Sequence, residues 1–135
     1  MSNIKKVNLG SHGLVVPTIG LGCMGMTPIE GYGDQYGKAD EKEAIATIHR
    51  SLELGGNFLD TADIYGPFLN ERLIAKAIKG NRDKYIIATK FGNEINDEGS
   101  ITGKVNGSKD YIRKSVERSL KNLETDYIDL YYQHR

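Results

Sequence analysis

The sequence has little cysteine and no excess of either charge. Its 135 residues include one cysteine, Cys23, and 18 Lys and Arg balanced by 18 Asp and Glu. A single cysteine cannot form a disulfide within the chain, and it excludes zinc sites built from paired cysteines. Without a basic surplus, the sequence gives no sign of the many phosphate contacts that drive nucleic-acid binding. We therefore expect a protein of a reducing compartment, without a metal site and without a nucleic-acid partner.

Long hydrophobic runs are also missing. No stretch approaches the roughly 18 apolar residues of a membrane span, and the N-terminus lacks the apolar core of a signal peptide. We expect a cytoplasmic protein with no membrane partner. The segment Asn106-Gly107-Ser108 matches a glycosylation sequon, but we interpret it as a turn in which Ser108 caps the next helix.

From residue 57 onward, short β-rich runs alternate with longer segments of helical period. Strands are expected over residues 57–62, 85–90 and 127–133. The first helix between them has Asn70 as a plausible N-cap and Gly80 just past its end. The second begins at Ser108 and repeats apolar residues at helical spacing as far as Leu123.

The segment before residue 57 predicts one more helix and one more strand. Asp40 followed by Glu43 resembles a capping box, and the helix that follows ends near Gly55. Upstream we expect a strand over residues 18–23, preceded by a hairpin over residues 4–9 and 14–17. A hairpin followed by β-α-β-α-β-α-β predicts an α/β fold with a parallel sheet.

Four parallel strands fit either an open doubly wound sheet or a (β/α)₈ TIM barrel, and the polar residues at the strand ends favour the barrel. Period-two alternation places three sets on one face of successive strands: Phe58 and Asp60; Ile86, Ala88 and Lys90; Ile128, Leu130, Tyr132 and His134. In a barrel the apolar members fill the interior. Asp60, Lys90 and His134 then converge at the C-terminal rim, where barrel enzymes carry their catalytic residues.

Gly20, Gly22 and Gly25 match the G-x-G-x-x-G pattern of dinucleotide-binding sites. In that fingerprint the third glycine opens a helix, whereas residues 26–38 contain one proline and three glycines and cannot be helical. We reject the fingerprint and interpret the segment as a loop over a strand end, where glycines let a ligand approach the backbone.

Four residues form a candidate site for proton transfer. Lys90 ends an apolar strand on its interior side, where burial is costly unless a partner such as Asp60 pairs with it. A cationic Lys90 near Tyr65 would favour the phenolate and make Tyr65 a usable proton donor. His134 could donate a hydrogen bond to a substrate oxygen or help proton transfer.

Three of these residues also have a purely structural interpretation. Asp60 could be a cap, Tyr65 a packing residue and His134 a satisfied histidine at a chain end. The remaining charged residues near the motif are expected to face solvent or to cap helices; they are Asp63, Glu71 and Arg72.

Several of these motifs, in this order, make the sequence resemble the N-terminal half of an aldo-keto reductase, a (β/α)₈ barrel oxidoreductase that uses NADPH without a Rossmann fold. The matching segments are the hairpin and residues 20–25, 57–66, 88–92 and 131–135. We expect residues 1–135 to be the N-terminal half of one such barrel domain. A complete barrel needs ~200 residues or more, so the chain holds the hairpin and about four β/α units of an incomplete barrel.

The resemblance implies an NADPH-dependent reduction of a small carbonyl substrate, an aldehyde or a ketone, to an alcohol. By this resemblance Tyr65 is the general acid, Asp60 and Lys90 tune it, and His134 orients the carbonyl. The residues expected beside the cofactor are Gly22, Cys23, Met24 and Asp60. In the family, most other cofactor contacts belong to the half that this chain lacks.

Two further functions stay open. A half-barrel would leave the interior faces of Phe58, Ile86 and Leu130 in water and two strands as open edges, which pair readily with other chains. The chain could therefore self-associate and act as a non-enzymatic oligomeric or partner-binding protein. The other is a regulatory subunit related to the reductases, which binds nucleotide and turns over slowly.

Overall fold

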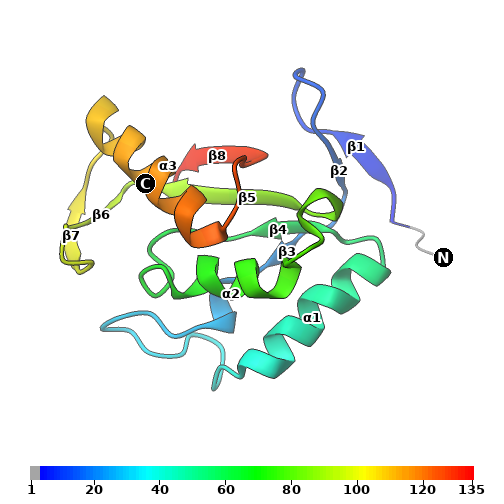
Figure 1. Ribbon diagram of the computed structural model, residues 1–135, viewed down its shortest axis with the longest axis horizontal. Coiled ribbons are helices and arrows are strands. Elements are labelled where there is room, and N and C mark those ends of the chain that lie inside the picture. The colour runs from blue at the N-terminus through cyan, green and yellow to red at the C-terminus, as the bar shows by residue number, and fades with distance from the viewer. Residues whose placement is uncertain (1–3) are drawn as a thin grey trace.

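A computed structural model describes residues 4–135. At its centre is a four-stranded sheet in the order β3-β4-β5-β8 (Figure 1). The strands are β3 (Leu21–Gly22), β4 (Phe58–Asp60), β5 (Ile86–Phe91) and β8 (Leu130–Gln133). All three pairings are parallel, which confirms the predicted parallel sheet and requires a crossover between successive strands.

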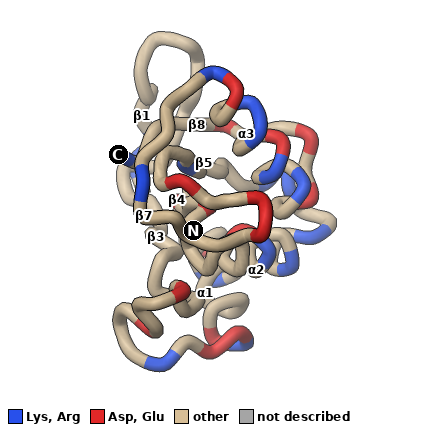
Figure 2. The backbone as a smooth tube through the Cα atoms, turned by 90° about the vertical axis from the view of Figure 1, so that its left-hand side faces the viewer, with Lys and Arg blue, Asp and Glu red and all other residues tan. Residues whose placement is uncertain are grey.

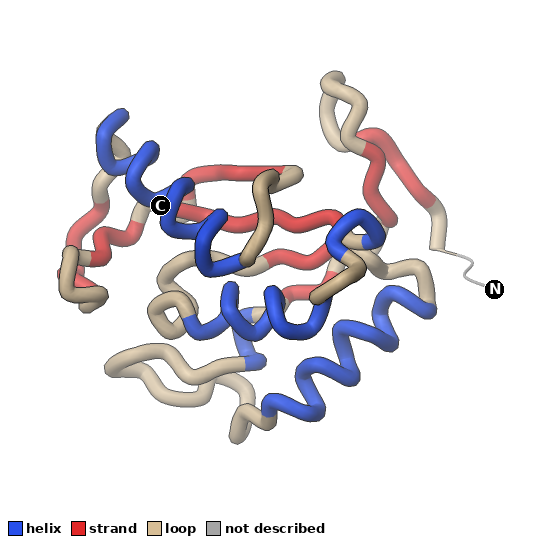
Figure 3. Tube along the Cα trace, viewed as in Figure 1, coloured by secondary structure: helices blue, strands red, loops and turns tan. Residues whose placement is uncertain are grey.

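Three α-helices supply these crossovers and lie on one side of the sheet (Figure 3). They are α1 (Glu41–Glu53), α2 (Leu69–Ile78) and α3 (Lys109–Leu123). The hydrophobic core fills the space between helices and sheet, and its fully buried members include Ile48, Leu59, Ile74, Ile87 and Leu123. Burying each such side chain contributes about 1.5–3 kcal/mol, so this layer fixes the helices on the sheet.

The opposite face of the sheet is the interior of the incomplete barrel. Leu59 and Ile87 point into the helix-covered core, so alternation places Asp60 and Lys90 on the other face. The apolar residues predicted for this face, Phe58, Ile86 and Leu130, are half-buried. Ile128 was expected there too, but that prediction is wrong: Ile128 packs against the helix-side core, because β8 and its alternation begin only at Leu130.

Two of the three predicted helix starts are correct. The Asp40 side chain accepts a hydrogen bond from the Glu43 N–H at 2.8 Å at the start of α1, and Ser108 accepts from the Tyr111 N–H at 3.3 Å at the start of α3. The prediction for Asn70 is wrong. Phe68, with a left-handed φ of 68°, precedes α2, and Asn70 lies buried within the helix.

Replacing Asp40 by Ala is expected to lower the free energy of unfolding by about 1 kcal/mol, because the Glu43 N–H loses its acceptor. Asp40→Ser keeps an acceptor oxygen and is the matched control. Urea unfolding of the three proteins measures the difference, and equal losses in both variants would contradict a capping role for the side-chain oxygen.

Two antiparallel hairpins flank the sheet. The first, β1 (Lys6–Asn8) with β2 (Val15–Pro17), was predicted. The second, β6 (Asn93–Ile95) with β7 (Ile101–Val105), was not. The Tyr111 hydroxyl of α3 accepts from the Ile95 N–H at 2.8 Å and donates to the Asn93 carbonyl at 3.1 Å. The residue that holds the second hairpin thus lies 16 positions or more away in the sequence, so no local sequence pattern indicates the contact.

Acidic and basic residues are interspersed along the outer segments, as along α3, and do not separate by sign (Figure 2). Over residues 4–135 the structure has no helix with the length and apolarity that crossing a membrane requires.

Candidate active site

The carboxyl ends of three parallel strands bring the four predicted site residues together. Asp60 ends β4 and Lys90 lies one residue before the end of β5. His134 directly follows β8, where its N–H donates to the Phe91 carbonyl at 2.7 Å. Tyr65 comes from the loop between β4 and α2 and reaches Lys90. The predicted convergence at this end of the sheet is therefore present in the structure.

Lys90 is the centre of the cluster. Its ammonium donates to Asp60 Oδ2 at 2.7 Å, to the Thr61 carbonyl at 2.8 Å and to the Tyr65 hydroxyl at 3.4 Å. The residue is only 6% exposed. Burial lowers the pKa of Lys90, but the hydrogen bond and charge of Asp60 outweigh that effect and hold the pKa above its usual value. Lys90 is therefore a cation at physiological pH.

Tyr65 is buried, with 7% of its surface exposed, and its hydroxyl lies beside this cation. The His134 ring meets the Tyr65 ring edge-on, with centroids 5.8 Å apart. The Tyr65 hydroxyl is thus within hydrogen-bond distance of a cation, and its ring contacts the imidazole of His134.

His134 is held neutral. Burial, and then the charges of Lys90 and Arg135, lower the pKa of its imidazole below the usual value. Its Nδ1 is buried and has no hydrogen-bond partner among the described residues. A neutral imidazole carries one N–H donor, which suits it to hold an uncharged oxygen acceptor in place.

Asp60 has a second partner that sequence reasoning missed. The Tyr132 hydroxyl donates to Asp60 Oδ1 at 2.5 Å, while Lys90 holds Oδ2. Tyr132 lies opposite Lys90 in the register of β5 and β8. The alternation that placed Tyr132 on the same face as His134 was the signal that could have found this contact.

Of the residues expected beside the cofactor, Asp60 ends β4, and Gly22, Cys23 and Met24 lie at the end of β3. Gly22 pairs with Asp60, and a Cβ at Gly22 would meet nothing within 4 Å, so open space lies next to the Asp60 backbone. Met24 begins the three-residue 3₁₀ helix η1 (Met24–Met26) and is half-buried. The next α-helix starts only at Glu41, which agrees with our rejection of the dinucleotide fingerprint.

The side chain of Cys23 points away from this space. It belongs to the hydrophobic core, and burial followed by the charge of Asp60 raises the pKa of its thiol to about 12. The Cys23 N–H donates to the Asp60 carbonyl at 2.9 Å. Any contribution of Cys23 to a cofactor site would therefore come from its backbone.

Asp63 and Glu71, expected to face solvent or cap a helix, are buried, so that prediction is wrong. Asp63 is 1% and Glu71 0% exposed. Glu71 accepts from Thr89 at 2.9 Å, and Asp63 pairs with Arg118 at 3.6 Å. Burial, and next the charge of Glu71, raise the pKa of Asp63 to about 7, and burial also raises the pKa of Glu71. Arg118, 55 positions after Asp63, provides the cation that makes this burial tolerable.

Asn70 joins the loop after β3 to the loop after β4. Its amide accepts from the Thr61 hydroxyl at 2.7 Å and donates to the Cys23 carbonyl at 2.8 Å and to Thr27 at 2.9 Å. Asn70 therefore ties the segment after β3 to the segment after β4, the two segments that carry Cys23 and Tyr65.

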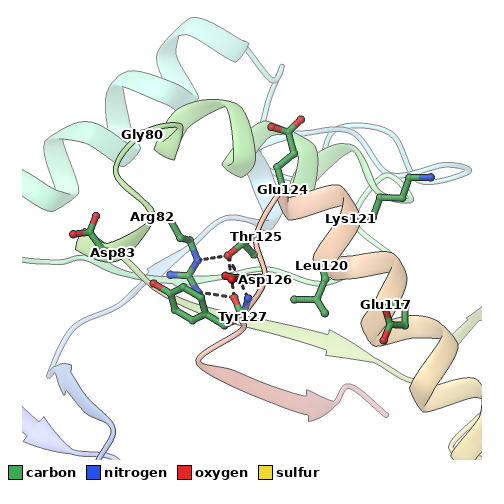
Figure 4. A pocket seen from close by; sticks show the side chains of 10 residues that line it. All are labelled: Gly80, Arg82, Asp83, Glu117, Leu120, Lys121, Glu124, Thr125, Asp126 and Tyr127. Atoms are coloured by element: carbon green, nitrogen blue, oxygen red, sulfur yellow. Dashed lines mark hydrogen bonds between the residues drawn. The ribbon is translucent and has the colours of Figure 1, made fainter.

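A surface hollow at the opposite end of the strands has a structural explanation (Figure 4). Arg82 donates there to Thr125, to Asp129 and to the Tyr127 carbonyl, at 2.8–3.0 Å, and its guanidinium lies 3.9 Å from the centre of the Tyr127 ring. These bonds tie the segment before β5 to the segment before β8. Since its donors are engaged within the chain, Arg82 is not free to hold a ligand.

Comparison with known proteins agrees with this geometry. Residues 18–135 match the family model described as Aldo/keto reductase family. A curated relative, a probable aldo-keto reductase 1 from Glycine max, is 44% identical over 135 residues, which are 99% of this chain and 37% of the relative. The chain thus spans well under half the length of this relative.

Solved structures give the same result. An aldo-keto reductase from Bacillus halodurans in a holo form superposes with a TM-score of 0.80 at 42% identity, over 96% of this chain and 40% of that one. An aldo-keto reductase from Klebsiella pneumoniae in complex with NADPH gives a TM-score of 0.70 at 26% identity, over 97% of this chain and 39% of that one. Both structures are about twice as long as this chain or longer.

Proposed function

The chain belongs to the aldo/keto reductase family, and we propose on that basis that it carries the catalytic side chains of an NADPH-dependent reduction of a small aldehyde or ketone to an alcohol. The observation that carries the proposal is the contact of the buried Lys90 with both Asp60 and Tyr65. We further propose that residues 1–135 form the N-terminal half of one barrel domain, and that the protein is cytoplasmic.

The end of β3, together with Asp60, fits a nicotinamide cofactor. The open space at Gly22 lies beside Asp60, whose side chain is 38% exposed. Gly22, Met24, Asp60 and the backbone of Cys23 would hold the cofactor there. When bound, NADPH supplies the hydride that reaches the carbonyl carbon. The remaining cofactor contacts are proposed to come from the part of the barrel that this chain does not span.

The side chains perform the proton transfer. The substrate oxygen accepts a hydrogen bond from His134 and lies next to the Tyr65 hydroxyl. The oxygen of the carbonyl being reduced would take the Tyr65 proton and become the hydroxyl of the alcohol. The phenolate left on Tyr65 is stabilised by Lys90, whose position is fixed by Asp60. A proton from solvent then restores Tyr65.

The test is an NADPH titration of the natural gene product, followed by nucleotide fluorescence, with the oligomeric state recorded at the same concentration. Saturable binding is expected, together with consumption of NADPH when an aromatic aldehyde is added. A folded sample that binds no NADPH in any oligomeric state would contradict the proposed function.

A second candidate, binding of another chain through the sheet, is favoured by a separate observation. β3 and β8 are the edges of the four-stranded sheet, and Phe58, Ile86 and Leu130 on the interior face are half-buried. A dimer or tetramer without NADPH affinity would favour this non-enzymatic function. Saturable NADPH binding with little turnover would favour a regulatory subunit.

A further inference from the structure

Both oxygens of the Asp60 carboxylate are engaged, and the two donors come from neighbouring strands. Lys90 of β5 holds Oδ2 at 2.7 Å, and Tyr132 of β8 holds Oδ1 at 2.5 Å. The two donors lie opposite each other in the register of the sheet. The Lys90 ammonium is 5.4 Å from the centre of the Tyr132 ring. Tyr132 is therefore part of the same polar cluster as Asp60 and Lys90.

Packing alone does not hold the Asp60 carboxylate. Its side chain is partly exposed, whereas that of Lys90 is buried. A carboxylate that accepts on one oxygen only can rotate or shift, but donors on both oxygens fix its plane. The Tyr132 hydroxyl also takes up part of the negative charge of Asp60. Less of that charge is then available to neutralise Lys90, and more of the Lys90 field reaches Tyr65.

We propose that Tyr132 is a positioning residue of the reduction, which fixes the Asp60 carboxylate against Lys90 and thereby sets how strongly Lys90 acts on Tyr65. The inference rests on the proposed function, because it assigns a role within that reaction. Tyr132 is 36% exposed. Partial desolvation of its hydroxyl, and next the hydrogen bond to Asp60, raise the pKa of Tyr132 above its usual value. The phenol therefore keeps its proton and remains a donor over the physiological range.

Tyr132→Phe tests the role of the hydroxyl alone, because Phe keeps the ring. The expected result is a kcat lowered about fivefold, in line with the net loss of one ordinary hydrogen bond, with KM little changed. Tyr127→Phe is the matched control, because Tyr127 lies against Arg82 at the opposite end of the strands. Its kcat and KM should equal those of the natural protein.

A double-mutant cycle separates this role from a general structural one. If Tyr132 acts through Asp60, Tyr132→Phe lowers kcat in the natural background but has no further effect in an Asp60→Asn background. The same loss in both backgrounds would overturn the proposal, and so would a Tyr132→Phe variant with the kcat of the natural protein.

A measurement without turnover distinguishes failure of this inference from failure of the proposed function. In protein labelled with ¹³C at tyrosine Cζ, the Tyr132 resonance is the one missing from the Tyr132→Phe spectrum. Asp60→Asn should lower the pKa of Tyr132 toward that of a free tyrosine, and an unchanged titration would refute the contact. If the contact is found but the natural protein reduces no carbonyl, the proposed function fails, and the positioning role is overturned with it although the hydrogen bond stands.

Discussion

Tyr65→Phe is expected to lower kcat for carbonyl reduction about a thousandfold, within the range by which general acids accelerate proton transfer. Phe keeps the ring that meets His134 edge-on and removes only the hydroxyl beside Lys90. The substrate oxygen then lacks the hydroxyl proposed to protonate it. Steady-state rates at saturating aldehyde and NADPH measure the loss.

The affinity for NADPH should stay within about twofold of the natural value in the same variant, since the residues proposed to hold the cofactor are at the end of β3 and at Asp60. Tyr85→Phe is the matched control: Tyr85 is also buried, but it precedes β5 at the opposite end of the sheet. Its rate should equal that of the natural protein. Turnover unchanged by Tyr65→Phe would refute the general-acid assignment.

The sequence was informative where local rules act alone. Alternation along short strands, together with a polar residue at each strand end, correctly placed Asp60 and Lys90 on one face of the sheet. Their pairing follows from the cost of burying an unpaired lysine, and the structure confirms it at 2.7 Å. The end of α2 was predicted equally well, because glycine tolerates the left-handed conformation found just past a helix end, as at Gly80 with its φ of 78°.

Long-range partners are what the sequence could not supply. Asn70 has the side chain of a good helix cap, but its amide instead bonds to Thr61 and to Cys23. Cys23 lies 47 positions before Asn70 in the sequence. Likewise, nothing near Glu71 shows that Thr89 will donate to it. Polar residues are expected at the surface unless a partner is known. The fold therefore followed from the pattern, whereas the polar contacts behind the site required the structure.

The buried pair of Asp63 and Glu71 predicts a stability that falls as pH rises. An acid whose pKa is raised in the folded state, here to about 7 from 3.8 for Asp63, binds more protons folded than unfolded between those values. Its contribution is complete below pH 3.8 and is lost as pH rises toward 7. Glu71 acts in the same direction. Around the pair lie Arg118, which opposes the shift of Asp63, and Tyr131.

Asp63→Asn removes the Asp63 part of this dependence. The difference in unfolding free energy between the variant and the natural protein should rise by about 3 kcal/mol from pH 5 to pH 8. This figure corresponds to roughly two pKa units at about 1.4 kcal/mol each. Urea unfolding at several pH values measures the gain. Asp97→Asn is the control, because the exposed Asp97 has a pKa lowered by Lys114 and stays ionised across this window. Curves for Asp63→Asn that run parallel to those of the natural protein would show that Asp63 is ionised in the fold throughout, so that Arg118 outweighs the cost of burial.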